Sequence, residues 1–455
     1  MGNIMPYLNQ SGGFERSRSI GHVPIAENEL IKESLRSFRI YNDQENLKID
    51  SSLLISANTL GTTETSIRWV FSFDGSPQEV VTKKAFPSTR IGYVQIAGIL
   101  VNLEQILNQG REHLVDPAIV RTATKEALYS IVLPGSNVCR LDMPTVKDSW
   151  RAQIFDIFES YTVEGTSLLN IFKLLVERSN KNSRNNGVIL ARCSASHSCS
   201  SRDIDVPFTG TVCPSCGGQL FPTDALRVHE EVSEEQKNEA ALNRLMSCLE
   251  HITMVGYLYF LWQRQPRTLG SVSCIMDGPL AIFGPQAWLH APILRFLHEL
   301  QESLTQKRLK PPLIIGIEKG GQFAEHAAAI KQHIPPQNLM LLPDNYIYQH
   351  ILASRPLSNS IYGYETYYGQ KFFYKTATEQ LLTITIPKLS QTVNDPHNPI
   401  YYQILPDSLA LLDRIGTALY KDAVIPVALA HSYASIPLRT GSRVLTLLSK
   451  DFLGQ

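Results

Sequence analysis

The 455-residue sequence lacks an excess of charge of either sign, because 42 Lys and Arg residues balance 42 Asp and Glu residues. Charged residues are also scarce, at 18% of the chain against about 25% in an average soluble protein. This balance excludes a histone-like or generally basic nucleic-acid binder, since such proteins neutralise phosphates with surplus Lys and Arg. It does not exclude an enzyme that acts on nucleic acid, because metal ions and partners can supply positive charge.

Long hydrophobic runs are absent as well. The most apolar stretch covers residues 252–262, whereas a membrane-spanning helix needs about 20 residues. The N-terminal residues contain no apolar core of a secretory signal, and Pro6 stands where a myristoylation motif requires Ser or Thr. No Gly-rich phosphate loop of the GxxxxGKS/T type occurs, so ATP hydrolysis would belong to a partner. These absences predict a cytoplasmic protein.

Hydrophobic residues nevertheless make up 43% of the chain, which is enough for a large core. Residues 1–60 are polar apart from one amphipathic stretch, and we expect them to form an N-terminal arm. In residues 61–455, short apolar runs alternate with segments whose apolar residues recur at helical spacing. This pattern predicts an α/β domain with a mixed or parallel sheet flanked by helices. Strands are expected at 67–73, 92–103, 271–278, 313–321 and in FFYKT and LLTITIP; helices are expected within 25–38, 145–178, 233–263, 290–306 and 406–421.

Four of the seven cysteines cluster in the sequence: Cys193, Cys199, Cys213 and Cys216. Without a secretory signal, such a cluster indicates metal binding rather than disulfides. The CPSCGG segment is typical of a knuckle whose amides turn toward two thiolates, and four thiolates complete a closed, structural Zn²⁺ site. The first pair is more widely spaced than usual, so His197 is an alternative ligand, and free thiols are the other interpretation. We predict a zinc-binding insertion over residues 191–222.

Two Asp-Gly pairs follow apolar stretches, at Asp74-Gly75 and Asp277-Gly278. Each is expected to end a strand and begin a tight turn, a common use of Asp-Gly in any protein. A strand-end Asp also projects its carboxylate at the edge of a sheet. Two or three converging carboxylates can bind the Mg²⁺ or Mn²⁺ ions used in phosphodiester cleavage. Asp74 and Asp277 are therefore candidate metal ligands if a third acid joins them.

The predicted helix over 233–263, which Ser233 and Gln236 would cap, supplies candidates for the third acid. It precedes the strand that ends at Asp277 and is expected to run antiparallel to it. Asp277 lies roughly 20 Å from the start of its strand, and 20 Å back along the helix corresponds to about 13 residues. This distance selects Glu250, while Glu239 would lie about 16 Å too far along and is the reserve. A solvated helix charge is the other interpretation of Glu250.

Taken in order, these motifs resemble the NurA nuclease family, and most of all its bacterial branch with a zinc-ribbon-like insertion. The resemblance spans roughly residues 65–445 and leaves residues 1–60 uncovered. The segments that carry it are FDGS, CPSCGG followed by TDALRVHE, IMDGPLAIFG, IGIEKGGQF, YYGQKFFYKT and PVALAHSYASIPL. The resemblance implies that the predicted mixed sheet is RNase H-like.

The same resemblance implies a function. Family members are Mn²⁺- or Mg²⁺-dependent deoxyribonucleases that act as 5′-to-3′ exonucleases and single-strand endonucleases. They form homodimers that dock on the hexameric HerA translocase, in DNA end processing and, in many bacteria, in antiphage defence. We therefore expect this chain to bind DNA, a HerA-type hexameric ATPase and a second copy of itself. A catalytically silent DNA-end clamp or assembly scaffold of the same complex is the alternative.

Individual residues take their roles from the same resemblance. Asp74, Glu250 and Asp277 correspond to the metal-binding acids of the family. His431 corresponds to its C-terminal histidine, which can bind a metal or move a proton; a packed histidine at a strand end is the other interpretation. The active-site tyrosine of the family would fall near Ala423, where this chain has none, and the nearest is Tyr420.

Basic and aromatic side chains gather in the last third of the chain. Lys319 follows an apolar strand and is expected either to contact the scissile phosphate or to be solvated. Seven tyrosines lie between residues 346 and 375, together with Arg355, Lys371 and Lys375. Rings stack on unpaired bases while cations hold the backbone, so this stretch predicts a single-strand channel with Lys371 and Lys375 on the phosphates. Packing of β-strands is the other interpretation.

Overall fold

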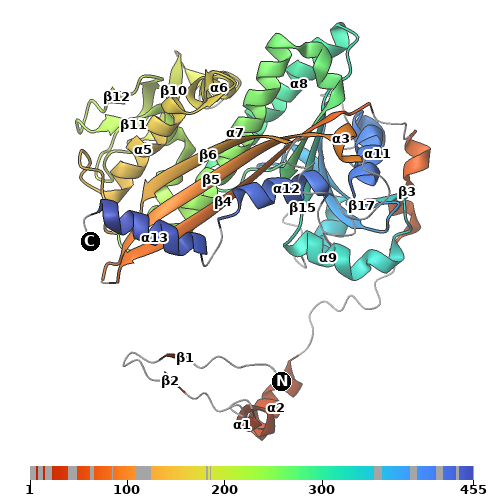
Figure 1. Cartoon of the computed structure of the whole chain (residues 1–455), viewed down its shortest axis with the longest axis horizontal. Coiled ribbons are helices and arrows are strands. Elements are labelled where there is room, and N and C mark those ends of the chain that lie inside the picture. Colours follow the sequence, from red (N-terminus) through yellow and green to blue (C-terminus); the bar gives the residue numbers. More distant parts are fainter. Residues whose placement is uncertain are drawn as a thin grey trace. The chain divides into compact units, whose positions relative to one another are not determined.

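In a computed structural model, the chain consists of two units, Met1–Lys48 and Ile49–Gln455. The smaller unit contains the antiparallel pair β1 (Tyr7–Leu8) and β2 (Phe14–Glu15), followed by helices α1 (Val23–Glu27) and α2 (Glu29–Ser37) (Figure 1). The amide of Leu30 donates a hydrogen bond to the side chain of Asn28, which caps α2. The structure describes residues 7–8, 14–15, 23–38, 49–61, 66–84, 86–107, 124–180, 183–184, 186–352, 361–389, 397–416, 424–436 and 440–453.

The larger unit is built on a nine-stranded sheet with the order β3-β16-β17-β18-β15-β14-β4-β5-β6. β4, β5 and β6 form an antiparallel meander, β14 is parallel to β4, and β15 is parallel to β14. This five-strand order is that of an RNase H-like sheet, and the antiparallel strands β18, β17, β16 and β3 extend it. The strands are β3 (Leu54–Ser56), β4 (Trp69–Lys83), β5 (Thr89–Asn102), β6 (Thr124–Pro134), β14 (Val272–Asp277), β15 (Leu313–Glu318), β16 (Asn338–Leu341), β17 (Gly369–Lys375) and β18 (Leu381–Pro387).

Helices flank this sheet, which confirms the predicted fold class (Figure 1). The longest, α7, is apolar on nearly all sides and is therefore buried against β4 and β5. Among the described residues, no helix is long and apolar enough to cross a membrane. The helices of this unit are α3 (Leu103–Leu107), α5 (Val146–Ser160), α6 (Leu168–Val176), α7 (Glu239–Arg264), α8 (His290–Gln306), α9 (Gln322–Ile330), α10 (Asp344–Tyr346), α11 (Leu405–Ile415), α12 (Ile425–Ala434) and α13 (Thr440–Phe452).

Short strands outside the large sheet form three small sheets in the described part of this unit. The hairpin β7 (Thr162–Val163) and β8 (Thr166–Ser167) separates α5 from α6, so the helical stretch expected over 145–178 is two helices. A three-stranded sheet is formed by β9 (Ser183–Arg184), β10 (Gly187–Arg192) and β11 (Arg202–Pro207). A separate pair follows it in the sequence, β12 (Thr211–Val212) and β13 (Gln219–Leu220). The last four of these strands carry the cysteine cluster between them.

Two boundaries differ from those predicted. The strand expected to end at Asp74-Gly75 continues through both residues as β4, because β5 pairs with it over nearly its whole length. The helix expected from Ser233 begins at Glu239, since the side chain of Ser233 accepts amide hydrogen bonds within a separate turn. The amide of Asn238, just before α7, instead donates to the carboxylate of Glu79 on β4.

The N-terminal boundary also shifts. We expected an arm over residues 1–60, but β3 pairs with β16 at the edge of the large sheet. The amide of Ala57 adds a hydrogen bond to the carbonyl of Gln337 beside this pairing. Residues 49–60 therefore belong to the larger unit, and the separate unit ends at Lys48.

Candidate metal centre and cysteine module

The sheet register brings two of the predicted acids together. Asp74 lies within β4, and Asp277 is the last residue of the parallel neighbour β14. Phe73 and Met276, the residues directly before them, are register partners. Residues at the same position on neighbouring strands point to the same face, so the two carboxylates lie side by side.

His431 joins these two acids from the C-terminal part of the chain. It lies on α12 rather than at a strand end, and its Nδ1 is 2.8 Å from Oδ2 of Asp74. One ligand atom from each of Asp74, Asp277 and His431 lies within 4.8 Å of the other two. The His431 side chain is 63% exposed while Asp74 is buried, so the group opens to solvent on its imidazole side.

Glu250 approaches β4 from α7, the helix that packs on the opposite face. Gly75 leaves room for it, because a Cβ at that position would lie 2.8 Å from Oε1 of Glu250 and 2.5 Å from Cγ of Met246. Successive strand residues face opposite sides, so Gly75 faces α7 while Asp74 faces His431 on α12. The glycine of this Asp-Gly pair thus permits a close approach rather than the turn we predicted.

The structure separates the two candidates for the third acid. Glu250 is buried near the two aspartates, whose charges act on it. Glu239 is the first residue of α7 and lines a cavity of about 400 Å³ together with Glu79, Arg90 and Lys237. Of the two candidates, Glu250 is therefore the one whose pKa the aspartates influence, and it lies on the α7 side of β4 and outside the set of three ligand atoms. Its role as the third acid stays a prediction.

The acids are close enough to disturb one another's ionisation. Burial, followed by the negative charge of Asp277, raises the pKa of Asp74 from 3.8 to about 6, and the hydrogen bond from His431 opposes this rise. Burial also raises the pKa of Glu250 well above 4.5, and the charges of Asp74 and Asp277 add to the effect. Clustered carboxylates with raised pKa values are a feature of sites that bind cations or move protons.

Lys319 lies at the rim of this acidic group. It follows β15, and its Nζ is 2.5 Å from Oδ2 of Asp277. Its side chain is 29% exposed, so the ammonium contacts both the acid and solvent. The interpretation as a fully solvated lysine is wrong, and its role toward a phosphate stays a prediction.

Lys371 and Lys375 are not available to a DNA backbone in this structure. Both are buried, at 3% and 7% exposure. Nζ of Lys371 lies 2.7 Å from Glu318, and Nζ of Lys375 donates to the carbonyl of Lys331. Because both ammonium groups already have internal partners, the prediction that they contact phosphates is corrected.

The tyrosine-rich stretch is partly core. Tyr346, Tyr368 and Tyr374 are buried, as the strand-packing interpretation expected. Tyr348, Tyr362 and Tyr367 are only partly covered, and Tyr364 is 73% exposed. The predicted positions Arg355, Tyr420 and Ala423 lie outside the described residues.

Sequence reasoning missed one buried polar pair beside the site. His251 follows Glu250 on α7, and its Nδ1 is 2.7 Å from the hydroxyl of Tyr368. The amide of Tyr368 in turn donates to the carbonyl of Leu280, three residues after Asp277. The pair links the helix that carries Glu250 to the segment that follows Asp277. No local spacing could have indicated it, because its two members lie 117 positions apart.

The four predicted cysteines converge on one point. Sγ of Cys193 lies 3.6 Å from Sγ of Cys216, and Sγ of Cys199 lies 3.8 Å from Sγ of Cys213. All four sulfurs lie within 4.8 Å of one another. Four thiolates about 2.3 Å from a tetrahedral Zn²⁺ would be separated by about 3.8 Å, so this set fits the ion. The backbone amides of Cys216 and Ser215 lower the pKa of Cys213 to about 6, which favours the thiolate.

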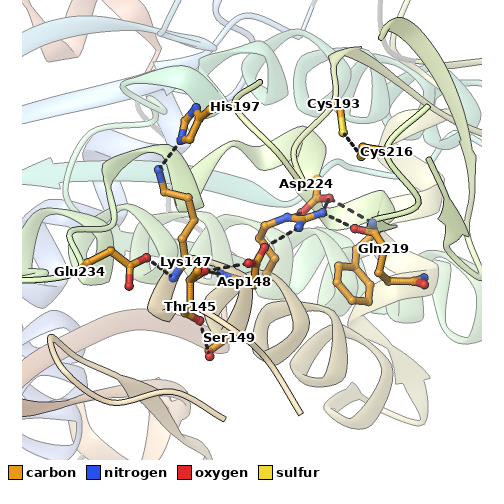
Figure 2. A network of polar contacts seen from close by, with 12 residues as sticks. Thr145, Lys147, Asp148, Ser149, Cys193, His197, Cys216, Gln219, Asp224 and Glu234 are labelled. Atoms are coloured by element: carbon orange, nitrogen blue, oxygen red, sulfur yellow. Dashed lines mark hydrogen bonds and ion pairs between the residues drawn. The ribbon is translucent and has the colours of Figure 1, made fainter. Parts of the chain in front are cut away.

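His197 does not belong to this cluster. Its Nε2 lies 3.2 Å from Nζ of Lys147 on α5, and Figure 2 shows it pointing toward that lysine and away from Cys193 and Cys216. Buried Arg151 holds the end of the module and the segment after it, because it donates to the carbonyl of Gln219 and to both carboxylate oxygens of Asp224. The cysteine module is therefore docked on α5 through a charged, buried contact.

No protein-family model and no curated protein sequence matches this chain. Among solved structures, it is similar to one described as "Crystal structure of the NurA nuclease from Sulfolobus solfataricus", with 8% identity, a TM-score of 0.36, and coverage of 96% of this chain and 98% of that chain. It is also similar to one described as "Crystal structure of NurA", with 11% identity, a TM-score of 0.28, and coverage of 95% and 96%. Both likenesses are too slight to assign a family, so the function must be inferred from the site.

Proposed function

We propose that this protein is a metal-dependent deoxyribonuclease. The observation that carries the proposal is the convergence of Asp74, Asp277 and His431 on an RNase H-like sheet. Glu250 is buried nearby on the α7 side of β4, where Gly75 leaves room for it. Two acids from separate strands meet here although 203 positions separate them (277 − 74). Carboxylates so arranged are the ligands that two-metal phosphodiester hydrolysis uses.

The donor set fits a hard divalent cation. Mn²⁺ and Mg²⁺ favour carboxylate oxygens, and Mn²⁺ also accepts an imidazole nitrogen. Asp74 and Asp277, with Glu250 and His431, would hold the ion or ions. A bound cation would offset the burial and the mutual repulsion that raise the pKa values of Asp74 and Glu250. When bound, the metal supplies an activated water and a positive charge for the leaving oxygen.

The residues of the chain have separate roles in this proposal. The ammonium of Lys319 lies at the rim and contacts Asp277. If Asp277 binds a metal instead, this ammonium can bind a phosphate oxygen. His431 is exposed and held by Asp74, so its free nitrogen can bind metal or pass a proton to the leaving group. The buried pair of His251 and Tyr368 keeps the Glu250 helix in place.

The finer points of the proposal rest on the resemblance of the sequence motifs. They are 5′-to-3′ exonuclease and single-strand endonuclease activity, a homodimer, and cooperation with a HerA-type hexameric ATPase in end processing or antiphage defence. The net charge of zero supports a need for a partner, since the chain offers little electrostatic attraction for DNA. We expect weak, salt-sensitive cleavage by the protein alone and much faster cleavage in the complex.

The proposal also includes a separate, structural Zn²⁺ that the four cysteines hold. The sulfur separations and the buried position of two of these residues support it. The closed thiolate shell leaves no open coordination position, so the ion would stabilise the module rather than act in cleavage.

The test is cleavage of single-stranded and linear duplex DNA, labelled at either end, with Mn²⁺, Mg²⁺ or EDTA, and with or without the ATPase. We expect metal-dependent degradation that Asp74→Ala and Asp277→Ala each abolish while the folded protein keeps its circular dichroism spectrum. Cleavage that persists in both variants would refute the site. Binding of DNA ends without cleavage in any metal would identify the silent clamp instead.

A further inference from the structure

A row of aromatic rings begins on the segment that follows Asp277. Phe283 contacts Tyr367 edge to face at a centroid distance of 5.6 Å, and Tyr367 contacts Tyr362 at 5.5 Å. Tyr348 continues the series at 6.2 Å from Tyr362. We call these four residues the aromatic row. They come from three separate segments: the loop after β14, the helical turn after α10, and the loop before β17.

Backbone pairing attaches the aromatic row to the segment that carries Asp277. Ala281 and Tyr367 form an antiparallel bridge, and the amide of Ile282 donates to the carbonyl of Thr366. Phe283 therefore follows the catalytic candidate Asp277 by six positions on a segment with fixed backbone contacts (283 − 277). The row cannot shift far without moving this segment.

A buried ion pair lies against the row. Nζ of Lys371 lies 4.9 Å from the ring centre of Tyr367 and 5.9 Å from that of Tyr362. The same ammonium pairs with Glu318, whose neighbour Lys319 holds Asp277. The ion pair thus contacts the rings at the carboxyl end of β15, on the face of the sheet opposite to Asp277.

The row contains no charged side chain, and part of it is exposed. Phe283 is 40% exposed, and its neighbours in the row are partly exposed. Two further exposed side chains, Ile361 at 49% and Tyr364 at 73%, flank Tyr362 in sequence. Flat rings at a surface bind the faces of unpaired bases, whereas the bases of a duplex are already stacked on one another. Stacking also suits a site whose carboxylates repel phosphates.

We propose that the aromatic row binds the bases of single-stranded DNA next to the acidic group, with Phe283 as its exposed stacking ring. This inference rests on the proposed nuclease function for its choice of ligand. It replaces the buried Lys371 and Lys375 as the strand contacts. It also gives the protein a preference for unpaired ends, which base-independent phosphate contacts would not provide.

The test is equilibrium binding of a fluorescent oligothymidylate at low salt in EDTA, so that no cleavage is needed. A second strand of the same length has abasic sites in place of the bases and keeps every phosphate. We expect wild-type protein to bind the strand with bases more tightly. Phe283→Ala should weaken that binding roughly tenfold and leave binding of the abasic strand at the wild-type level, because one stacked base contributes about 1–3 kcal/mol.

Two further substitutions at the same position separate stacking from bulk. Phe283→Trp keeps an aromatic face and should restore binding, whereas Phe283→Leu keeps apolar volume and should not. Phe452→Ala on α13 is the matched control, since this ring is 82% exposed but outside the row. Unchanged melting temperatures would exclude misfolding.

Three results would overturn the inference. They are equal affinity of wild-type protein for both strands, an equal loss on both strands in Phe283→Ala, and a loss confined to binding of the ATPase. The last would make the row a protein-docking surface. If the protein binds the strand with bases more tightly but cleaves no DNA, that result would count against the nuclease proposal alone.

Discussion

Replacing Asp74 by Asn should stabilise the metal-free protein while abolishing its activity. Burial and the charge of Asp277 raise the pKa of Asp74 from 3.8 to about 6. At about 1.4 kcal/mol per pKa unit, the ionised carboxylate destabilises the folded state by about 3 kcal/mol at neutral pH. His431 and Gly75 both donate to this carboxylate, and Asn keeps only one acceptor oxygen. The net gain should therefore be about 1–2 kcal/mol.

The pH dependence follows from the direction of the shift. A folded-state pKa above the unfolded value means that the folded protein binds more protons between pH 3.8 and about 6. The penalty is therefore absent below the lower value, grows through this window, and is complete above it. The stability difference between Asp74→Asn and wild type should be full at pH 7.5 and nearly absent at pH 4.

Calorimetric melting in EDTA and in Mn²⁺ measures both effects. For a chain of this length, 2 kcal/mol corresponds to about 2 °C. Mn²⁺ at 100 times its dissociation constant should stabilise wild type by about 2.7 kcal/mol and the variant by much less. Asp451→Asn, an exposed acid on α13, is the control and should change neither value. The reasoning fails if Asp74→Asn is no more stable than wild type in EDTA at pH 7.5, or if Mn²⁺ stabilises both equally.

Three other substitutions test the remaining features. Gly75→Ala would push against Glu250, and we expect Mn²⁺-dependent cleavage to fall by about 100-fold in a nuclease assay, since displacements near 1 Å can cost that much. Replacing Cys213 and Cys216 by Ser should remove about one zinc per chain by elemental analysis and lower the melting temperature. Arg151→Ala leaves a buried acid unpaired and should cost about 3–5 kcal/mol in urea unfolding.

Each of these substitutions has a matched control in the chain. Gly98→Ala on β5 places its Cβ no closer than 3.5 Å to another side chain, so full activity is expected. Cys139→Ser removes an exposed thiol outside the cluster and should leave the zinc content unchanged. Adding Asp224→Asn to Arg151→Ala should recover part of the lost stability, because the unpaired charge is then gone. Loss of activity in Gly98→Ala, or unchanged zinc in the cysteine variant, would contradict the assignments.

The local chemistry of the site could be predicted from the sequence because it depends on short-range patterns. The CPSCGG knuckle indicates thiolates that turn toward one point, and the apolar runs before Asp74 and Asp277 indicate strands in one sheet. The choice of Glu250 over Glu239 needed only the rise per residue of a helix and a strand. These inferences use distances of a few residues, where backbone geometry leaves little freedom.

Other features depended on partners that lie far away in the sequence. Lys371 carries a cation of the kind that contacts phosphates, but Glu318 and the surrounding rings bury its ammonium group. The Asp74-Gly75 pair is typical of a turn, but pairing with β5 keeps β4 extended there. The glycine instead leaves space for the side chain of Glu250 from α7.

The charge balance and the motif order, both visible in the sequence, limited the protein to a neutral α/β chain with acids suited to binding metal. Only the tertiary structure decided which side chains face one another. The parallel register of β4 and β14 placed Asp74 beside Asp277, and the packing of α12 placed His431 at 2.8 Å from Asp74. The physical reason is that side-chain burial and pairing depend on contacts between distant segments, and a local sequence pattern contains no information about them.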